Sequence, residues 1–331
     1  KQNMIIVTGG AGFIGSNIAE KLKNDNEDVI ICDRIDDHLK LSNITFLNNK
    51  KVLAPENLNQ FIIKNKSKLK AIIHMGAISS TAEKNLALLL KVNVQFSKEV
   101  FQLANKYSIK FIYASSASTY GIGDQGFDDD NDLMKMNTLK PINKYGLSKY
   151  LFDLSILQEL KINNYLLPSK PIGLKFFNVY GKNEIHKGFM MSPIPKFYSQ
   201  IKKKGQLKLF KSHNPNFKNG MQSRDFVYID DCVNIVEFFL KHKNLSGIYN
   251  VGSGKNETFL RVAEIIFKSL KIEKNIKFIP TPLNIRAGYQ YMTKANMKRI
   301  RDIGFKDKFT PINRGIKKYI SEYLSINPIN Y

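Results

Sequence analysis

The sequence of 331 residues has little of what would place it in several common protein classes. Its two cysteines, Cys32 and Cys232, are too few for a disulfide-stabilised scaffold, and their spacing fits no metal site. No run of 18 apolar residues could form a transmembrane helix, and no secretory signal pattern is present. We therefore expect a cytoplasmic protein without structural disulfides and without a metal.

Acidic residues are also scarce: 28 Asp and Glu stand against 51 Lys and Arg, for a net charge of +23. Such a charge suggests nucleic-acid binding. The lysines, however, are spread along the whole chain, and no Arg-rich arm or basic stripe with interleaved aromatics occurs. We interpret Lys202-Lys203-Lys204 as a solvent-exposed helix end. We expect neither nucleic acid nor membrane as a partner, whereas an anionic small-molecule substrate suits the charge.

The chain alternates short apolar runs with segments of helical period. The main expected strands and helices are strands 4–8, 28–33, 70–77, 110–116, 173–181, 207–210, 247–254 and 276–279, and helices 13–24, 56–66, 83–107, 143–161, 190–203, 231–242 and 258–270. This alternation predicts an α/β fold, a doubly wound parallel sheet (Rossmann) with a smaller C-terminal substrate lobe. We expect residues 1–181 to form mainly the dinucleotide-binding domain and 182–331 mainly the lobe, with 225–254 returning to the first domain.

The stretch "VTGGAGFIGSN" at 7–17 concentrates glycines between an expected strand and an expected helix. A G-x-G-x-x-G pattern begins at Gly10, a wider G-x-x-G-x-x-G spacing begins at Gly9, and both end at Gly15. In this context the glycines let a pyrophosphate approach the helix N-terminus. Asp33 ends the next strand, where a carboxylate can bind the adenosine ribose. The alternative is a tight turn that binds nothing, but the context favours a dinucleotide.

A candidate acid/base pair follows in "YGLSK" at 145–149, which sets Tyr145 and Lys149 four residues apart on one helix face. The ammonium favours the phenolate, so we expect it to lower the pKa of Tyr145 and make it a general acid/base. In "YASSASTYG" the hydroxyl of Ser116 can bind the same substrate oxygen. The alternative is an ordinary exposed Tyr–Lys pair, because Y-x-x-x-K also occurs by chance.

The motifs T-G-G-x-G-F-I-G, S-S-x-x-T-Y-G, Y-x-x-x-K, F-N-V-Y-G and R-D-F-V-Y-x-x-D occur in this order. Together they resemble the extended short-chain dehydrogenase/reductase family of nucleotide-sugar enzymes over nearly the whole chain. Within that family, "HMGAISST", "HKGFM" and "RAGYQ" are most similar to the ADP-heptose 6-epimerases of lipopolysaccharide inner-core synthesis. The resemblance implies epimerisation at C6 by transient oxidation, with a bound nicotinamide cofactor and an ADP-sugar substrate. We also expect a homo-oligomer.

The resemblance also implies roles for individual residues. The catalytic residues would be Tyr145, Lys149, Ser116 and Lys187. The cofactor would be held by Gly9, Gly12, Phe13, Ile14, Gly15, Asp33, Arg34, Lys40, Met75, Gly76, Ala77, Ile78, Ser79, Asn93, Tyr145, Lys149, Val179 and Lys187. The substrate would contact Ser116, Asn178, Phe189, Lys196, Phe210, Lys211, Ser212, His213, Arg224 and Tyr289.

The chain departs from this subfamily at several sugar-side positions. Phe189 stands where the subfamily tends to have Ser, and Lys196 where it tends to have His. An extra stretch, 214–223, precedes Arg224. These differences concern contacts to the sugar more than the chemistry.

Several single residues have a simpler interpretation. His74 follows an apolar strand and is interpreted as a packed core histidine, and the acidic run at 128–130 as a solvated loop. Lys187 could be a second acid/base or only a phosphate-binding lysine, and both alternatives stay open. Arg224 could support the following turn, although a substrate phosphate is the favoured partner.

Three residues near the expected adenosine ribose give conflicting indications of whether the cofactor is NAD or NADP. Asp33 favours NAD, because a carboxylate accepts the 2′-hydroxyl and repels a 2′-phosphate. Arg34 and Lys40 favour NADP, because two cations can clamp that phosphate. We expect NADP, with NAD as the alternative.

Three other functions compete with a heptose epimerase. A UDP-hexose 4-epimerase would use the same pair of residues and the same transient ketone. A 4,6-dehydratase would place Asp-Glu after the hydroxyl residue, whereas Ser116 is followed by Ala117-Ser118. A non-catalytic dinucleotide-binding regulator would keep the fold, but the intact set of Ser116, Tyr145 and Lys149 argues against it.

Overall fold

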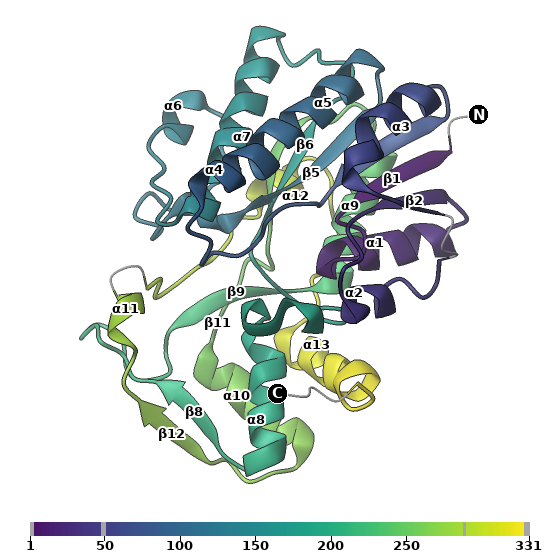
Figure 1. The fold of residues 1–331 in the computed structure, drawn as a ribbon. Helices are drawn as coiled ribbons and strands as arrows, with labels where there is room; N and C mark the ends of the chain where they lie inside the picture. The colour runs from purple at the N-terminus through teal and green to yellow at the C-terminus, as the bar shows by residue number, and fades with distance from the viewer. Residues whose placement is uncertain (1–2, 48–50, 287–288, 328–331) are drawn as a thin grey trace.

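A computed structural model describes residues 3–47, 51–286 and 289–327 and contains a parallel sheet of seven strands (Figure 1). Its strands, in spatial order, are β10 (Gly247–Val251), β6 (Ile172–Phe176), β5 (Lys110–Ser116), β4 (Leu69–His74), β1 (Met4–Thr8), β2 (Asp28–Cys32) and β3 (Val52–Leu53). The chain winds outward from β1 to β3 and then resumes at β4 on the other side of β1. The strand order therefore reverses between β1 and β4, as in the predicted doubly wound fold.

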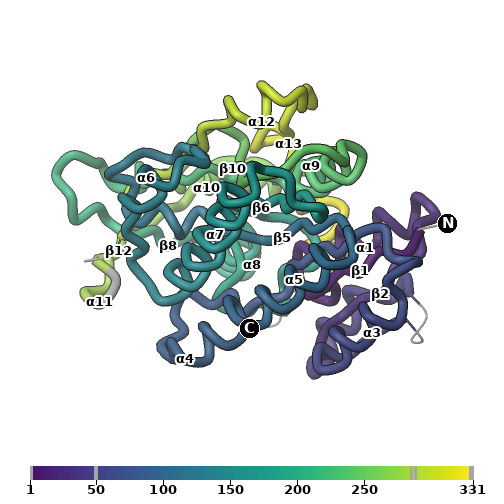
Figure 2. Tube along the Cα trace, turned by 90° about the horizontal axis from the view of Figure 1, so that it is seen from above, coloured from purple at the N-terminus to yellow at the C-terminus, as the bar shows by residue number. Residues whose placement is uncertain are grey.

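Alternate side chains of the central strands pack against helices on opposite faces of the sheet. Ile5 and Val7 belong to a core cluster with one layer, whereas Ile6 belongs to the cluster on the opposite face. The first layer contains α1 (Phe13–Asn24) and α9 (Ile229–Lys241); the second contains α3 (Leu58–Asn65), α5 (Ser97–Lys106) and α7 (Lys144–Ile162). Seen from above, α5 and α7 lie over β5 (Figure 2).

The later part of the chain builds a smaller lobe below the sheet in Figure 1. Its elements are α8 (Pro193–Lys204), β8 (Leu207–Phe210), α10 (Phe259–Leu270), β12 (Ile276–Ile279) and α13 (Ile312–Tyr319), which continues into η6 (Ile320–Leu324). A three-stranded sheet of β7 (Asn178–Tyr180), β9 (Ser223–Tyr228) and β11 (Asn256–Thr258) lies between the two parts. Because α9 and β10 pack with the main sheet, we propose the division at 181 with 225–254 returning.

Two expected elements differ from the sequence prediction. The prediction of a single strand over 173–181 is wrong. Strand β6 ends at Phe176, and β7 pairs with β9 in another sheet. The cause is Phe177, whose N–H donates to Val251 (3.0 Å) while its ring packs against Tyr120 and Phe127. The expected helix 83–107 is interrupted by a π-helical segment, η3 (Leu90–Phe96).

Short elements complete the chain, and some of them lie inside the expected helices 56–66 and 83–107. They are α2 (His38–Ser42), η2 (Pro55–Asn57), α4 (Leu86–Leu89), η4 (Ala117–Tyr120), α6 (Leu133–Met136), η5 (Ile185–Met190), α11 (Leu283–Arg286) and α12 (Lys298–Asp302). Among the helices of the described ranges, none has the length and apolarity needed to cross a bilayer. The same residues contain no cluster of His, Cys, Asp or Glu that could hold a metal.

Candidate active site

The glycine-rich loop joins β1 to α1 at the edge where the strand order reverses. Gly9 has φ of +63°, and a Cβ there would lie 2.7 Å from the backbone of Gly76. A Cβ on Gly15 would collide with the carbonyl of Gly9. Helix α1 begins after Gly12 without a side-chain cap, so its first N–H groups are available to an anion. A backbone this close, with an uncapped helix start, fits the pyrophosphate of a dinucleotide.

Asp33, directly after β2, holds this loop through its carboxylate. Ala11 N donates to Oδ2 (3.0 Å), while Arg34 N (2.8 Å) and Lys40 Nζ (3.4 Å) donate to Oδ1. The guanidinium of Arg34 instead forms a surface ion pair with Glu56. The structure thus brings Asp33 and Lys40 together and directs Arg34 toward Glu56.

The loop from Met75 to Ser79 follows β4 and is fixed by one amide. Asn93, buried in η3, donates from Nδ2 to the carbonyl of Ile78 (3.0 Å) and accepts from the N–H of the same residue (2.9 Å). Its Nδ2 also donates to Ser148 on α7 (3.0 Å). Asn93 therefore ties the cofactor-side loop to the helix that carries the Tyr–Lys pair.

His74 is a core histidine, as predicted. Its ring nitrogens lie 2.8 Å from the hydroxyl of Thr8 and 2.9 Å from that of Ser97. Burial lowers the pKa of His74 to about 3, so the ring is neutral at physiological pH.

Ser116 and Tyr145 are brought together by a short turn, η4, that packs on the first turn of α7. Ser116 caps η4 by accepting a hydrogen bond from Ser118 N (3.1 Å), and Asn143 caps α7 by accepting from Gly146 N (2.7 Å). A Cβ on Gly146 would lie 2.7 Å from the carbonyl of Ser118, so the two turns touch through backbone. Burial raises the pKa of Tyr145, and a hydrogen bond with Ser116 opposes that rise.

Lys149 is buried one helical turn after Tyr145. Its Nζ donates to the carbonyl of Ala114 (2.8 Å), and burial lowers its pKa to about 8. The prediction that Lys149 depresses the pKa of Tyr145 is therefore wrong for this arrangement: burial dominates, and the ammonium is directed at Ala114. A lysine with a pKa near 8 can nevertheless exchange a proton close to neutral pH.

Lys187 approaches the glycine-rich loop from η5. Its Nζ lies 5.7 Å from the centre of the Phe13 ring, and burial lowers its pKa while the nearby Glu184 opposes this change. Glu184 itself is fully buried and accepts hydrogen bonds from Gly181 N (3.2 Å) and Ser192 N (2.6 Å). The sequence analysis did not single out Glu184, although an acidic residue three positions before Lys187 was a usable signal.

Arg224, on β9, is a half-buried cation that lies against aromatic rings. Its guanidinium lies 5.5 Å from the ring centre of Phe259 and 5.6 Å from that of Tyr289, and it donates to the carbonyl of Ser223 (2.8 Å). Burial lowers its pKa. Across the described ranges no carboxylate forms an ion pair with Arg224. Such a cation suits an anionic ligand.

The segment Phe210–His213 begins at the last residue of β8 and meets the 289–291 segment. Tyr291 lies with its hydroxyl 2.8 Å from His213 Nδ1, and the rings of His213 and Tyr289 have centres 5.7 Å apart. The extra stretch also joins this cluster, because Phe217 packs on Tyr291 at 4.7 Å between ring centres. Ala287 and Gly288 of the "RAGYQ" motif lie outside the described residues.

The remaining predicted substrate residues lie on β7 and around η5. Asn178 and Val179 are half-buried on β7 and pair with β9. Phe189 is 71% exposed, and Lys196 Nζ donates to its carbonyl. The structure thus places Phe189 at the surface.

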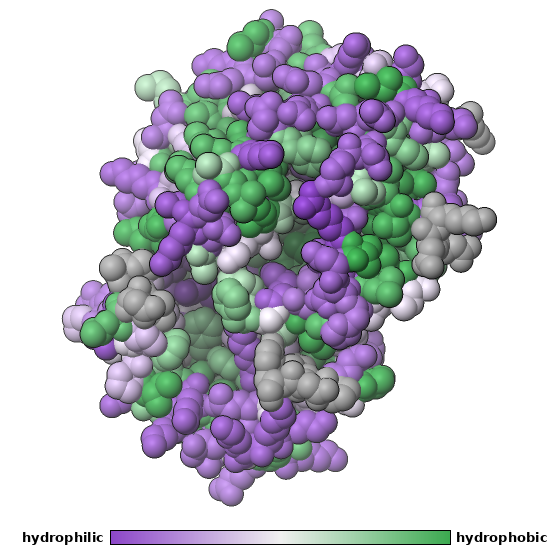
Figure 3. Space-filling model, in the orientation of Figure 1, coloured by the Kyte–Doolittle hydropathy of each residue, from purple (hydrophilic) through white to green (hydrophobic). Residues whose placement is uncertain are grey.

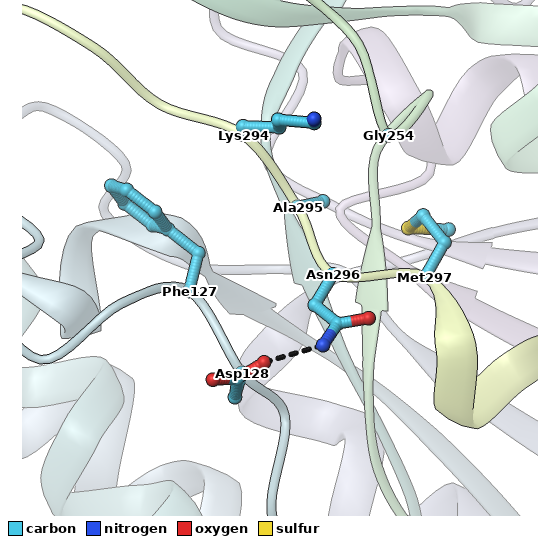
Figure 4. A pocket seen from close by; sticks show the side chains of 7 residues that line it. All are labelled: Phe127, Asp128, Gly254, Lys294, Ala295, Asn296 and Met297. Atoms are coloured by element: carbon cyan, nitrogen blue, oxygen red, sulfur yellow. Dashed lines mark hydrogen bonds between the residues drawn. The ribbon is translucent and has the colours of Figure 1, made fainter.

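The face that carries these loops is hollowed between the two parts of the molecule (Figure 3). A separate cavity of about 480 Å³ is lined by Phe127, Asp128, Gly254, Lys294, Ala295, Asn296 and Met297 (Figure 4). Asn296 donates to Asp128 within it (2.5 Å). None of the predicted site residues lines this cavity, so we do not assign it to the candidate active site.

Comparisons with known proteins agree with the motifs. Residues 5–252 match the NAD dependent epimerase/dehydratase family. The chain is 38% identical over 331 residues to a Fusobacterium nucleatum protein named ADP-L-glycero-D-manno-heptose-6-epimerase, covering 97% of this chain and 98% of that protein. The Helicobacter pylori ADP-L-glycero-D-manno-heptose-6-epimerase structure has a TM-score of 0.78 at 25% identity, covering 97% of this chain and 96% of that one. The Thermotoga maritima UDP-glucose 4-epimerase structure, with UDP-glucose, has a TM-score of 0.78 at 23% identity, covering 98% and 99%.

Proposed function

This chain belongs to the NAD dependent epimerase/dehydratase family, and from that premise we propose that it epimerises C6 of ADP-D-glycero-D-manno-heptose to give the L-glycero form for lipopolysaccharide inner-core synthesis. The observation that carries the proposal is the full-length 38% identity to a protein named for this reaction. The similarity to a UDP-glucose 4-epimerase, at 23% identity, reflects the shared fold. The 4-epimerase alternative is therefore not favoured.

Inversion at C6 requires removal of a hydrogen that has no acidity. A bound nicotinamide would supply the redox chemistry, namely reversible hydride transfer at this carbon. Tyr145 takes the hydroxyl proton as the alcohol becomes a ketone, and Ser116 holds the oxygen. Lys149, with its pKa lowered to about 8, supports proton exchange at the end of β5. The residues of the glycine-rich loop and of 75–79 would hold the cofactor.

The ketone intermediate must rotate within the site before the second half-reaction. A proton donor on another side of the sugar is therefore useful. Lys187 comes from η5, an element separate from α7, and its pKa is lowered by burial. We assign it the second acid/base role. A lysine that only bound phosphate would instead change cofactor affinity and leave turnover intact.

The substrate's diphosphate is assigned to Arg224. The guanidinium is half-buried near Phe259 and Tyr289 and lacks a carboxylate partner in the described ranges. Two phosphates would supply the missing negative charge. The Phe210–His213 segment and Tyr289 are then candidates for the nucleoside end.

The cofactor is a nicotinamide dinucleotide, and we propose that it is NAD, in place of the NADP that the sequence analysis favours. Arg34 is drawn to Glu56, which reduces its value as a phosphate clamp. Lys40 lies beside Asp33 and Asp36, so its charge is also compensated. The family description names NAD. A cytoplasmic location and a homo-oligomer remain part of this proposal.

Incubation of the purified protein with a panel of ADP- and UDP-sugars, followed by NMR of the products, tests the function. We expect inversion at C6 of ADP-heptose to exceed any conversion of UDP-galactose. Faster conversion of UDP-galactose would move the assignment to the 4-epimerases. Mass spectrometry of the same sample should detect a nicotinamide dinucleotide, and its absence together with inactivity on every sugar would indicate a non-catalytic protein.

A further inference from the structure

A buried ion pair lies directly beneath the turn that carries Ser116. Lys175 on β6 and Asp153 on α7 are 2% and 0% exposed, and Nζ and Oδ2 are 3.4 Å apart. Asp153 also accepts hydrogen bonds from Tyr113 (2.9 Å) and Ser115 (2.6 Å). All of these side chains are inside the protein, and the proposed chemistry assigns none of them a role.

The ammonium reaches the catalytic turn through one hydroxyl. Lys175 Nζ donates to Thr119 Oγ1 (2.8 Å), and Thr119 Oγ1 donates in turn to the carbonyl of Ser116 (2.9 Å). Nζ also lies 4.5 Å from the ring centre of Tyr120, over the last residue of η4. Lys175 therefore contacts η4 at Thr119 and at Tyr120. Through Thr119 it also fixes Ser116, the residue that caps the start of η4.

We propose that Lys175 is a positioning residue for the reaction, which acts through Thr119 to hold the Ser116 hydroxyl against Tyr145. This inference rests on the proposed function for its kinetic consequence. A simple structural role would need only charge neutralisation of Asp153. The hydrogen bond to Thr119 goes beyond that need, because it connects the ion pair to the backbone of the residue that contacts the phenol.

The charge of Asp153 supports the same assignment. Asp153 lies one helical turn beyond Lys149, and its negative charge raises the pKa of both Lys149 and Tyr145. Lys175 is the cation that offsets this charge. Removal of the Lys175 ammonium would leave the buried carboxylate of Asp153 without its cation, close to Tyr145 and Lys149.

The main test compares Lys175→Met with Lys175→Arg in steady-state epimerisation. We expect Lys175→Met to lower kcat by about 10- to 100-fold, the effect of a small misplacement of a catalytic group. KM for the ADP-sugar should stay nearly unchanged, since Lys175 is not placed in the substrate site, and Lys175→Arg should recover much of kcat. Lys110→Met is the control, because Lys110 is half-buried, lies at the opposite end of β5 and donates to the carbonyl of Leu245. It should leave kcat near wild type.

Thr119→Val keeps the volume and the ion pair but removes the connecting hydroxyl, so it tests the proposal even if Lys175→Met does not fold. We expect it to lower kcat by roughly ten-fold. Amide hydrogen exchange of residues 116–121 should be faster in Thr119→Val and unchanged in Lys110→Met. Wild-type kcat and exchange in Thr119→Val would overturn the proposal. Exchange needs no substrate, so it still decides the positioning role if the wild type fails on ADP-heptose, which would overturn the proposed function instead.

Discussion

The two sides of the candidate site treat buried charge in opposite ways. On the sheet side, Lys175 is paired with Asp153 and linked to neighbouring hydroxyls. On the lobe side, Arg224 is half-buried against aromatic rings and forms no ion pair with any described carboxylate. Burying a paired charge holds a structure in place, whereas burying an uncompensated one is unfavourable unless a ligand supplies the counter-charge. The difference separates the part that positions the chemistry from the part that binds an anion.

Tyr145→Phe should have the largest effect. It removes only the phenolic hydroxyl, so we expect turnover to fall by about 10²- to 10⁴-fold, the range for a lost general acid/base. The cofactor should stay bound, as measured by mass spectrometry of the purified variant, because its other contacts are intact. Tyr150→Phe, on the same helix and half-buried, is the control. Near-normal epimerisation by Tyr145→Phe would show that the Tyr–Lys assignment is wrong.

Arg224→Met addresses the comparison directly. We expect KM for the ADP-sugar to rise by about 10- to 100-fold, since a charge-assisted hydrogen bond contributes roughly 1.5–3 kcal/mol. The free energy of unfolding should not fall, because the substitution removes a half-buried cation that has no acidic partner in the described ranges. Lys175→Met, by contrast, should be clearly destabilised. Arg261→Met, on the exposed side of α10 near Phe259, is the matched control.

The result that would contradict this prediction is an unchanged KM together with a loss of stability. Arg224 would then belong with the structural ion pairs, and the diphosphate would need another cation. Urea unfolding and substrate saturation on the same preparation measure both quantities.

His74 gives a pH-dependent test of the sheet side. Its pKa is lowered to about 3 in the folded protein by burial, against an ordinary value of 6.5. As pH falls below 6.5 the unfolded chain takes up a proton that the folded protein does not, so stability decreases toward pH 3 by up to about 1.4 kcal/mol per pH unit. His74→Gln should reduce this slope in urea unfolding between pH 7 and about 4.5, while His242→Gln, at an exposed position, should not. If His74→Gln leaves the pH dependence of the free energy of unfolding unchanged, His74 is not the buried neutral histidine described here.

The sheet side could be predicted from sequence because its signals are local. Gly9 to Gly15, the strand ending in Ser116, and the pair Tyr145 and Lys149 each lie within a short motif, and chain order alone brings them to one edge of a parallel sheet. Asp153 and Lys175 also left a signal, a carboxylate on the helix face of Tyr145 and Lys149 and a lysine inside an apolar strand. Their pairing could not be predicted, because it joins α7 to β6 and then to η4 through contacts that only the fold creates.

The lobe side was accessible only through resemblance. Arg224, Tyr289 and His213 come from three separate segments, and no spacing in the sequence indicates that their side chains meet. The pKa of Tyr145 shows a different limit. The spacing predicts that Tyr145 and Lys149 lie on one helix, and both lie on α7. The direction of the ammonium toward Ala114 and the burial of the phenol depend on tertiary packing, which the spacing does not contain.

The smallest expected effect concerns the cofactor and the double variant Arg34→Ala/Lys40→Ala. Both cations lie on the sheet side and both are paired, Arg34 with Glu56 and Lys40 with Asp33. The first pair is exposed and the second is partly buried, and ion pairs near a protein surface contribute about 1 kcal/mol or less. We therefore expect NAD affinity, measured by titration calorimetry of cofactor-free protein, to change by less than about five-fold. Lys70→Ala, which breaks a comparable pair with Glu27 at the opposite edge of the sheet, is the control. If the wild type binds NADP more tightly than NAD, and the double variant weakens NADP alone by roughly ten-fold or more, then these two cations form a phosphate clamp and the resident cofactor is NADP.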